Sequence, residues 1–434
     1  MSLLDKTWRG LVYLSILLSV ACDNSSSVGL ELETGDNQTE VLFREFDLPT
    51  RTVYIDSLRT DGTSNLIFGH HEDSIFGSVN VKGYTEIQYR NGAIPADTLD
   101  LESGIMYLEA GDLLTSNVFV DLNVEVRVLN DEIFNFVVYE ADQITNVDNE
   151  VVGELSIAAA DGLPIVVVDL DEEFTTFLWE HTLNANNIAD IDLNVELSVQ
   201  DENGGIITLD LNQDSTFIQL NSLDSRDTVF NTFFDFENHF HTVERDRSTG
   251  IFSSLQESGD LTISGDVAYI NALSGLYTSI DLSEFIAFLD ENLDVVINNA
   301  DLEIPVVGLD VNRVAQKNDN LRVFFSNETN QIDGPGALLD FENNGLAIDA
   351  EYAEFNLDRG QPTTIRILPL DEEDFNYDDD ITLFSQYLIQ RRVEDSTFVT
   401  TNFILFPTNN FSVEQTGLVA PSVKLKVFYT TLNE

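Results

Sequence analysis

The sequence predicts a mainly β protein with two β-sandwich or jelly-roll-like domains. Three observations favour this class: short runs alternate apolar and polar residues, turn residues separate the runs, and helical periodicity is rare. Alternation at every second residue puts one set of side chains in a core and the other in solvent, as in a half-buried antiparallel strand. Many short strands with frequent turns are typical of sandwiches and jelly rolls.

The clearest predicted strand covers residues 118–128, where alternate residues from Val120 to Val128 are all apolar. Acidic, amide and basic side chains occupy the positions between them. The same design predicts further strands at 192–199, 209–211, 216–220, 261–263 and 423–429. Turn pairs such as Asn91-Gly92 and Asp161-Gly162 separate such runs.

Helix is expected in only two places. At 281–289, Asp281 and Ser283 precede an apolar stripe with helical spacing, which predicts a capped helix. Residues 172–179 predict a second, short helical turn.

Two stretches resemble distant copies of one another, one starting at Ala96 and the other at Val295. Each consists of a strand, a loop and a strand that ends in an acidic, polar turn. This similarity predicts two β domains, 43–222 and 223–434, that meet in a polar segment.

The amino-terminal segment, 1–21, is predicted to be an export signal that ends before Cys22, the only cysteine of the chain. The apolar run from Leu11 to Ala21 is too short to span a bilayer and has the length of a signal-peptide core. A small residue before one early cysteine is typical of a bacterial lipoprotein, in which the cysteine is acylated and becomes the first mature residue. Ser19 replaces the leucine usual at its position, so an ordinary signal peptide cleaved near Ala21 is the alternative.

The segment that follows, 22–42, is polar and is predicted to be a flexible lipidated tether. The chain carries 77 acidic and 20 basic residues, a net charge of −57. Nucleic acid is therefore excluded as a partner, because phosphate binding needs clustered Lys and Arg. The membrane is expected to be reached through the lipid anchor, and the acidic surface favours divalent cations or cationic partners.

Segment 53–87 carries Asp56-Ser57, Gly69, Asp73, Phe76-Gly77 and Tyr84. Segment 263–306 adds a glycine-containing strand, a short helix and an Asn-Ala-Asp-Leu strand. These features resemble Bacteroidota outer-membrane lipoproteins known only as a domain of unknown function. The resemblance spans most of the mature chain and implies a surface lipoprotein, but it brings no catalytic residues.

Few residue groups suggest chemistry. His239 and His241 would share one strand face with Glu237, which is a weak metal candidate. Turns rich in Asp and Asn at 142–150, 201–205 and 372–380 could hold structural Ca²⁺, and no other cofactor is expected. No nucleophile elbow, phosphate loop or HExxH motif is present, so no catalytic residue is assigned.

An Asp followed by Ser or Thr and then an aliphatic residue or Thr resembles an O-glycosylation acceptor of exported proteins in this bacterial group. The pattern occurs at Ser57, Ser74, Thr98, Ser215, Thr228 and Ser396.

The leading functional hypothesis is a non-catalytic binding or accessory-subunit lipoprotein at the cell surface, beside an outer-membrane β-barrel protein. A glycan-binding module of a surface carbohydrate system is the alternative, and a secreted hydrolase is the third hypothesis. An accessory subunit should expose an apolar patch with a polar rim. A glycan binder should expose a row of aromatic residues drawn from Tyr84, Tyr89, Tyr107, Trp179 and Tyr277, and a hydrolase should have a cleft with a carboxylate pair.

Overall fold

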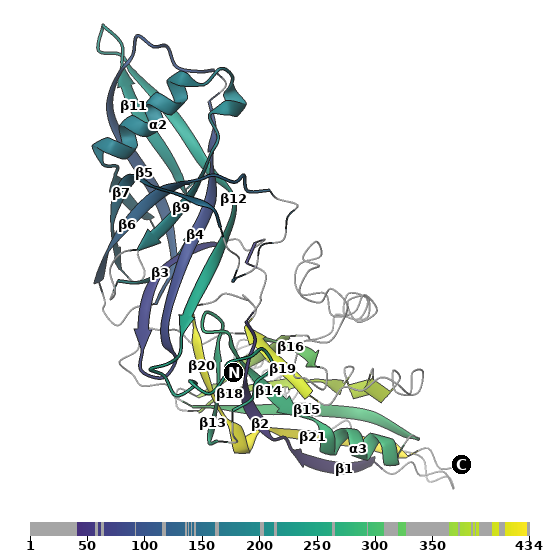
Figure 1. The fold of residues 1–434 in the computed structure, drawn as a ribbon. Coiled ribbons are helices and arrows are strands. Elements are labelled where there is room, and N and C mark those ends of the chain that lie inside the picture. The colour runs from purple at the N-terminus through teal and green to yellow at the C-terminus, as the bar shows by residue number, and fades with distance from the viewer. Residues whose placement is uncertain are drawn as a thin grey trace, which may run out of the picture.

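The computed structural model describes most of the chain from residue 41 to residue 431. The residues left out of this description within that range are 57–59, 62–64, 92, 115–118, 135–136, 138, 140, 143–144, 161–164, 200–203, 212–214, 263–264, 293, 308–319, 327–363, 372–373, 383–384, 387, 390–401 and 408–412. The fold is mainly β, with two antiparallel sheets, as the alternation predicts. Figure 1 shows two strand-rich parts joined end to end.

The first sheet is built from the middle of the chain. Its strands are β3 (Asn65–Asp73), β4 (Gly77–Tyr89), β5 (Asp100–Leu114), β6 (Phe119–Leu129), β7 (Val147–Ala160), β8 (Ile165–Asp169), β9 (Leu193–Val199), β10 (Gly205–Asp210), β11 (Phe217–Leu223) and β12 (Val229–Asp246). Hydrogen-bonded neighbours run from β12 through β11, β5, β10 and β3 to β4, and β4 pairs again with β12. The pairings therefore close on themselves, and β9, β6 and β7 extend the sheet from β4.

The second sheet combines the first strands of the described chain with the last ones. Its strands are β1 (Val41–Asp47), β2 (Thr50–Tyr54), β13 (Val267–Asn271), β14 (Leu276–Asp281), β15 (Val295–Val307), β16 (Asn320–Ser326), β17 (Thr364–Asp371), β18 (Asp374–Asp380), β19 (Asn402–Pro407), β20 (Gln415–Val419) and β21 (Lys424–Thr431). Eight of them form a closed ring, in the order β15-β18-β17-β16-β19-β14-β13-β20, because β20 pairs back with β15. Strands β21 and β1 continue from β15, and β2 pairs with β14.

Helices α2 (Glu172–Asn184) and α3 (Ser283–Glu291) lie where the sequence places them, whereas the helical residues 382, 385–386 and 388–389 were not expected. Helix α2 begins after Asp171, whose side chain accepts a hydrogen bond from the Phe174 amide, and α2 buries Phe174 and Trp179 against the first sheet. In helix α3, the amide of the first residue, Ser283, donates a hydrogen bond to the Asp281 side chain. Single 3₁₀ turns occur at Ile188–Asp190 and Ala420–Ser422. In the described part of the chain no helix has the length and apolar character needed to cross a bilayer.

The sheets divide the chain at places other than the expected boundary of 222/223. Strands β11 and β12 form a hairpin across that point, with Leu223 opposite Val229, so the boundary falls within one sheet. Strand β2 and all of β1 except Val41 and Leu42 belong to the expected 43–222 domain, yet these strands pair with β14 and β21. Figure 1 shows β1, in purple, beside the carboxy-terminal strand β21. The polar segment that suggested a domain boundary is the turn of the β11–β12 hairpin, and it does not connect the two sheets.

The passage between the two sheets is packed and follows β12. Phe76, from the β3–β4 turn, packs against Phe252 and Tyr269 of the second part, with ring centroids 6.0 and 5.6 Å away. Arg245 at the end of β12 donates to the Leu273 carbonyl at 2.6 Å. The largest apolar core contains residues of both sheets, so the two parts share a core.

Candidate functional site

The outer face of β1, β21 and β15 has the most distinctive surface in the described part of the protein. The register aligns four rows of side chains across the three strands, and each row takes one residue from β1, then β21, then β15. The rows are Val41, Thr430 and Val296; Phe43, Phe428 and Asn299; Glu45, Lys426 and Asp301; and Asp47, Lys424 and Glu303. We call the first two rows the apolar patch and the last two the charged rows.

Four large hydrophobic side chains of the apolar patch are exposed. Phe43 is 53% exposed, Val41 59%, Val296 39% and Phe428 38%. The rings of Phe43 and Phe428 touch, with centroids 4.9 Å apart. Scattered exposed hydrophobics are normal on a soluble protein, but neighbouring ones with a charged border are typical of an interaction surface.

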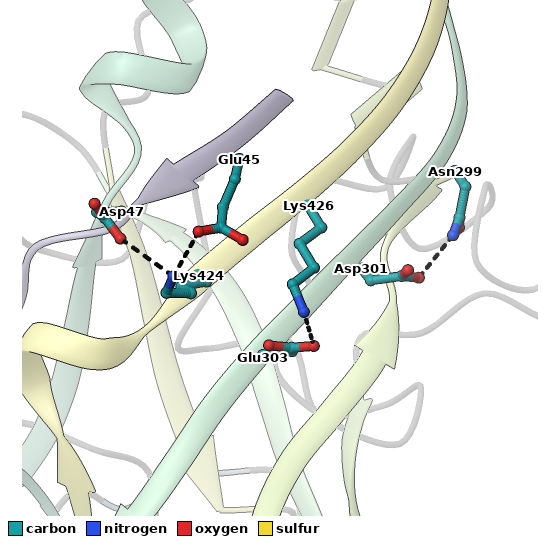
Figure 2. A network of polar contacts seen from close by, with 7 residues as sticks. All are labelled: Glu45, Asp47, Asn299, Asp301, Glu303, Lys424 and Lys426. Atoms are coloured by element: carbon teal, nitrogen blue, oxygen red, sulfur yellow. Dashed lines mark hydrogen bonds and ion pairs between the residues drawn. The ribbon is translucent and has the colours of Figure 1, made fainter. Parts of the chain in front are cut away.

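The charged rows form the border of the patch on one side. Figure 2 shows Lys424 between Glu45 and Asp47, and Lys426 reaching Glu303. The Lys424 ammonium lies 4.0 Å from the Asp47 carboxylate and forms a closer hydrogen bond with Glu45. These pairs cross from β21 to both neighbouring strands, so each lysine of β21 is paired with a carboxylate on an adjacent strand.

The electrostatics of the charged rows follow from these contacts. The hydrogen bond from Lys424 lowers the pKa of Glu45, and the same bond raises the pKa of Lys424. Burial raises the pKa of Asp301, although Asn299 donates a hydrogen bond to it at 2.7 Å. The nearby carboxylate of Asp380 on β18 raises that pKa further.

The opposite face of the same three strands is held by α3. Phe46 of β1 packs against Phe285 and Phe288 of the helix, with ring centroids 5.3 and 5.5 Å away. The Arg44 guanidinium lies 5.0 Å from the Phe288 ring centre and 3.7 Å from Glu284. Helix α3 therefore covers one face of β1 and leaves the apolar patch on the other.

The aromatic residues proposed for glycan binding are mostly in the core. Tyr84, Tyr89, Trp179 and Tyr277 are all buried, at 6% exposure or less. Their large apolar rings fill the cores, as aromatic residues in strands usually do. Only Tyr107 of the five lies on an outer face.

Tyr107 begins a short aromatic row that sequence reasoning missed. Its ring stacks on Phe217 of β11 with centroids 4.7 Å apart, and Phe233 of β12 follows at 6.0 Å from Phe217. The Arg90 guanidinium lies 5.3 Å from the Phe217 ring centre and is paired with Asp235. A sugar ring stacks on an open aromatic face, and the faces in this row are partly covered by each other and by Arg90.

The histidine pair lies on β12 in a different setting from the one predicted. A β-bulge puts Glu237 and Asn238 together opposite Glu86, and Asn238 donates to the Glu86 carboxylate at 2.6 Å. The extra residue breaks the alternation that would have placed Glu237 on the face of His239 and His241. His241 is fully buried.

Burial lowers the pKa of His241 to about 3, and the positive charges of His239 and Arg245 act in the same direction. The unfolded chain therefore binds one more proton than the folded chain between about pH 3 and 6.5, and stability falls as the pH drops through this range. We expect His241→Leu to reduce the slope of the free energy of unfolding against pH by up to about 1.4 kcal/mol per pH unit in this range. Urea unfolding at several pH values measures this slope. Above pH 7 the free energies of unfolding of the wild type and the variant should differ by a constant amount. If this difference also stays constant below pH 6, the lowered pKa of His241 is wrong.

The other predicted sites are distributed over the surface or lie outside the described residues. Within those residues, no group of three or more His, Cys, Asp or Glu side chains is placed to hold a metal ion. Ser74, Thr98 and Thr228 are exposed in turns, Ser215 is half-buried and donates to Glu109, and Ser57 and Ser396 lie outside the described residues. Their O-glycosylation stays a prediction.

A pocket of about 260 Å³ lies at the corner between β1 and β2. Asp47, Arg51 and Pro421 are among the residues that line it, and Asp47 is its only carboxylate.

Comparison of the chain with family models, with curated proteins and with solved structures found no match in any of the three. Cys22 and the predicted export signal also lie outside the described residues.

Proposed function

We propose that the protein is a non-catalytic lipoprotein, anchored in the outer membrane through Cys22, that acts as an accessory subunit at the cell surface. The apolar patch is its contact surface for a protein partner. The observation that carries the proposal is the exposure of Val41, Phe43, Val296 and Phe428 side by side on a face that the fold leaves open.

The position of the patch supports a role close to the membrane. Strand β1 begins at Val41, which follows Cys22 after only the predicted tether. An extended chain spans at most about 3.6 Å per residue, so this tether keeps the patch within several tens of ångströms of the bilayer. A partner resident in the same membrane would meet the patch at high effective concentration. The resemblance to Bacteroidota surface lipoproteins supports the same location.

The glycan-binding alternative receives less support from the described residues. The aromatic row at Tyr107, Phe217 and Phe233 has partly covered ring faces, which disfavours sugar stacking.

Photo-crosslinking in cells tests the proposal. A photoreactive phenylalanine in place of Phe43 is expected to capture one partner protein in stoichiometric amount. The double change Phe43→Ser and Phe428→Thr is expected to weaken co-purification of that partner from solubilised membranes by about tenfold or more, because each buried aromatic contributes about 1.5–3 kcal/mol. The fold should be kept, since both side chains lie outside the apolar cores, at 53% and 38% exposure, and the loss of their mutual ring contact should cost about 0.5–1.5 kcal/mol.

The hairpin between β11 and β12 offers a matched control. Val229 and Phe230 there are 60% and 44% exposed, like the patch residues, but they lie in the other sheet. Val229→Thr with Phe230→Ser should leave co-purification unchanged, and a photoreactive residue at 230 should not capture the same partner. Recovery of the wild-type protein alone, or equal losses in both double variants, would contradict the subunit role.

A further inference from the structure

Strand β1 is an open edge of the second sheet. It pairs with β21 along all seven of its residues, and in the described part of the chain no other strand pairs with it. Strand β2 differs, because its second edge is covered: the Tyr54 amide donates to the Asp260 carbonyl at 3.0 Å, and the Thr262 amide donates to the Thr52 carbonyl at 2.9 Å. Of these two strands, β1 is the one that presents an open backbone edge beside the apolar patch.

The sequence of β1 has only part of the usual protection of an edge strand. Natural proteins block such edges with charged side chains, especially lysine, and with proline, bulges or very short strands, and β1 has charged side chains at Arg44, Glu45 and Asp47. Residues 41–47 contain neither proline nor lysine, and their register with β21 is unbroken. The one basic side chain, Arg44, lies over the Phe46 and Phe288 rings on the side of α3. An open, regular edge of seven residues can pair with another strand.

We infer that the partner protein binds by adding an extended segment to β1 as an antiparallel strand. This inference rests on the proposed function and specifies how the partner binds. In this mode main-chain hydrogen bonds supply affinity and alternate side chains supply specificity. The added segment would place apolar residues opposite Val41 and Phe43 and basic residues opposite Glu45 and Asp47.

The negative charge of the protein favours a basic segment of a partner over a second copy of the same chain. The charged rows hold four carboxylates, on Glu45, Asp47, Asp301 and Glu303, and two ammonium groups, on Lys424 and Lys426. Asp47 is the most open of them, with its side chain 79% exposed. Two chains that each carry −57 would repel across a shared edge, whereas a basic segment would be attracted.

Pairing with β1 fixes the order of side chains in the segment. Read from its amino end, an antiparallel strand meets Asp47 first, Glu45 next, and then Phe43 and Val41. The matching peptide is Lys-Thr-Lys-Thr-Phe-Thr-Val, and the mismatched one replaces both lysines by glutamate. With the full chain in detergent, fluorescence anisotropy should show binding of the first peptide and binding at least about tenfold weaker of the second.

Backbone methylation of the peptide separates strand addition from contact through side chains alone. Amides of alternate residues in a strand point to opposite edges, so N-methylation of one alternate set should abolish binding and methylation of the other set should preserve it. Asp47→Lys should weaken binding of the lysine peptide several-fold, and Asp121→Lys, at an exposed position on β6, should not.

Several results would overturn the inference. Equal effects of the two methylated sets, or no peptide binding, would exclude strand addition. A dimer that loses its association when β1 is changed would assign the edge to a second copy. Peptide binding that appears only after deletion of residues 23–40 would assign the edge to the chain's own tether. If crosslinking from position 43 still captures a partner in these cases, the proposed function stands and only the binding mode fails.

Discussion

Replacing Cys22 by serine is expected to release the protein from the membrane fraction. A serine hydroxyl cannot take the thioether-linked lipid that a lipoprotein cysteine carries. Acyl chains contribute about 0.8 kcal/mol per buried methylene, and stable anchoring takes more than one chain. Without its acyl chains, the protein should sediment with washed membranes at about one tenth of the wild-type fraction or less. Labelling with radioactive palmitate gives a second readout that does not depend on where the signal is cleaved.

The segment before Cys22 provides the control. Ser19→Leu restores the leucine that lipoprotein signals usually have at this position. This variant should incorporate palmitate and sediment as the wild type does. If the wild-type chain takes up no palmitate, or if Cys22→Ser still sediments with envelope lipid, the lipoprotein assignment is wrong and the ordinary signal peptide cleaved near Ala21 becomes the better interpretation.

Gly77→Ala is expected to cost about 3 kcal/mol or more of unfolding free energy. Gly77 has a φ of +86°, a conformation that costs other residues about 1–2 kcal/mol. An added Cβ would also lie 2.2 Å from the Asp246 carbonyl oxygen, where backbone crosses backbone between β4 and the end of β12. Relief of that contact would move the β3–β4 turn away from the second sheet, and Phe76 would move with it.

Urea unfolding measures the effect, with Ser78→Ala as the control. Ser78 is the next residue on β4 and is half-buried, and its substitution should change stability by no more than about 0.5 kcal/mol. The Gly77 variant should also lose protection of the Ile251 amide, which donates to the Ile75 carbonyl at 3.0 Å, in hydrogen exchange. An unchanged urea midpoint would show that the backbone crossing can relax without cost.

The sequence predicted local structure well where the signal is local. Residues 119–128 of the predicted run form most of β6, and residues 424–429 form most of β21. Helix α3 forms within the predicted segment, but its N-cap residue is Leu282 and no side chain caps it, and Asp281 instead accepts a hydrogen bond from the Ser283 amide. The predicted turn at 172–179 extends into α2. Residues 261–263 differ, since Leu261 makes only an isolated bridge to Val53. Alternation there is too short to distinguish a strand from one pair of bonded residues.

The candidate site was not predicted, because residues 41–47, VLFREFD, do not alternate between apolar and polar side chains. Val41, Leu42 and Phe43 are all apolar, and Arg44 and Glu45 are both charged. The expected tether, 22–42, also ends inside this strand. Even when β1 is recognised as a strand, no local feature indicates that Phe43 touches Phe428.

Composition and short-range pattern determined the β class, the positions of α2 and α3, and strands such as β6, β9, β11 and β21. They also led to the expectation of an export signal. Tertiary structure alone decided that β1 and β2 join the carboxy-terminal sheet, that each sheet closes on itself, and that a bulge separates Glu237 from the histidines. The reason is physical. Side-chain alternation depends on neighbours along the chain, whereas strand pairing joins residues hundreds of positions apart, and loop-closure entropy depends too weakly on that separation to select a partner.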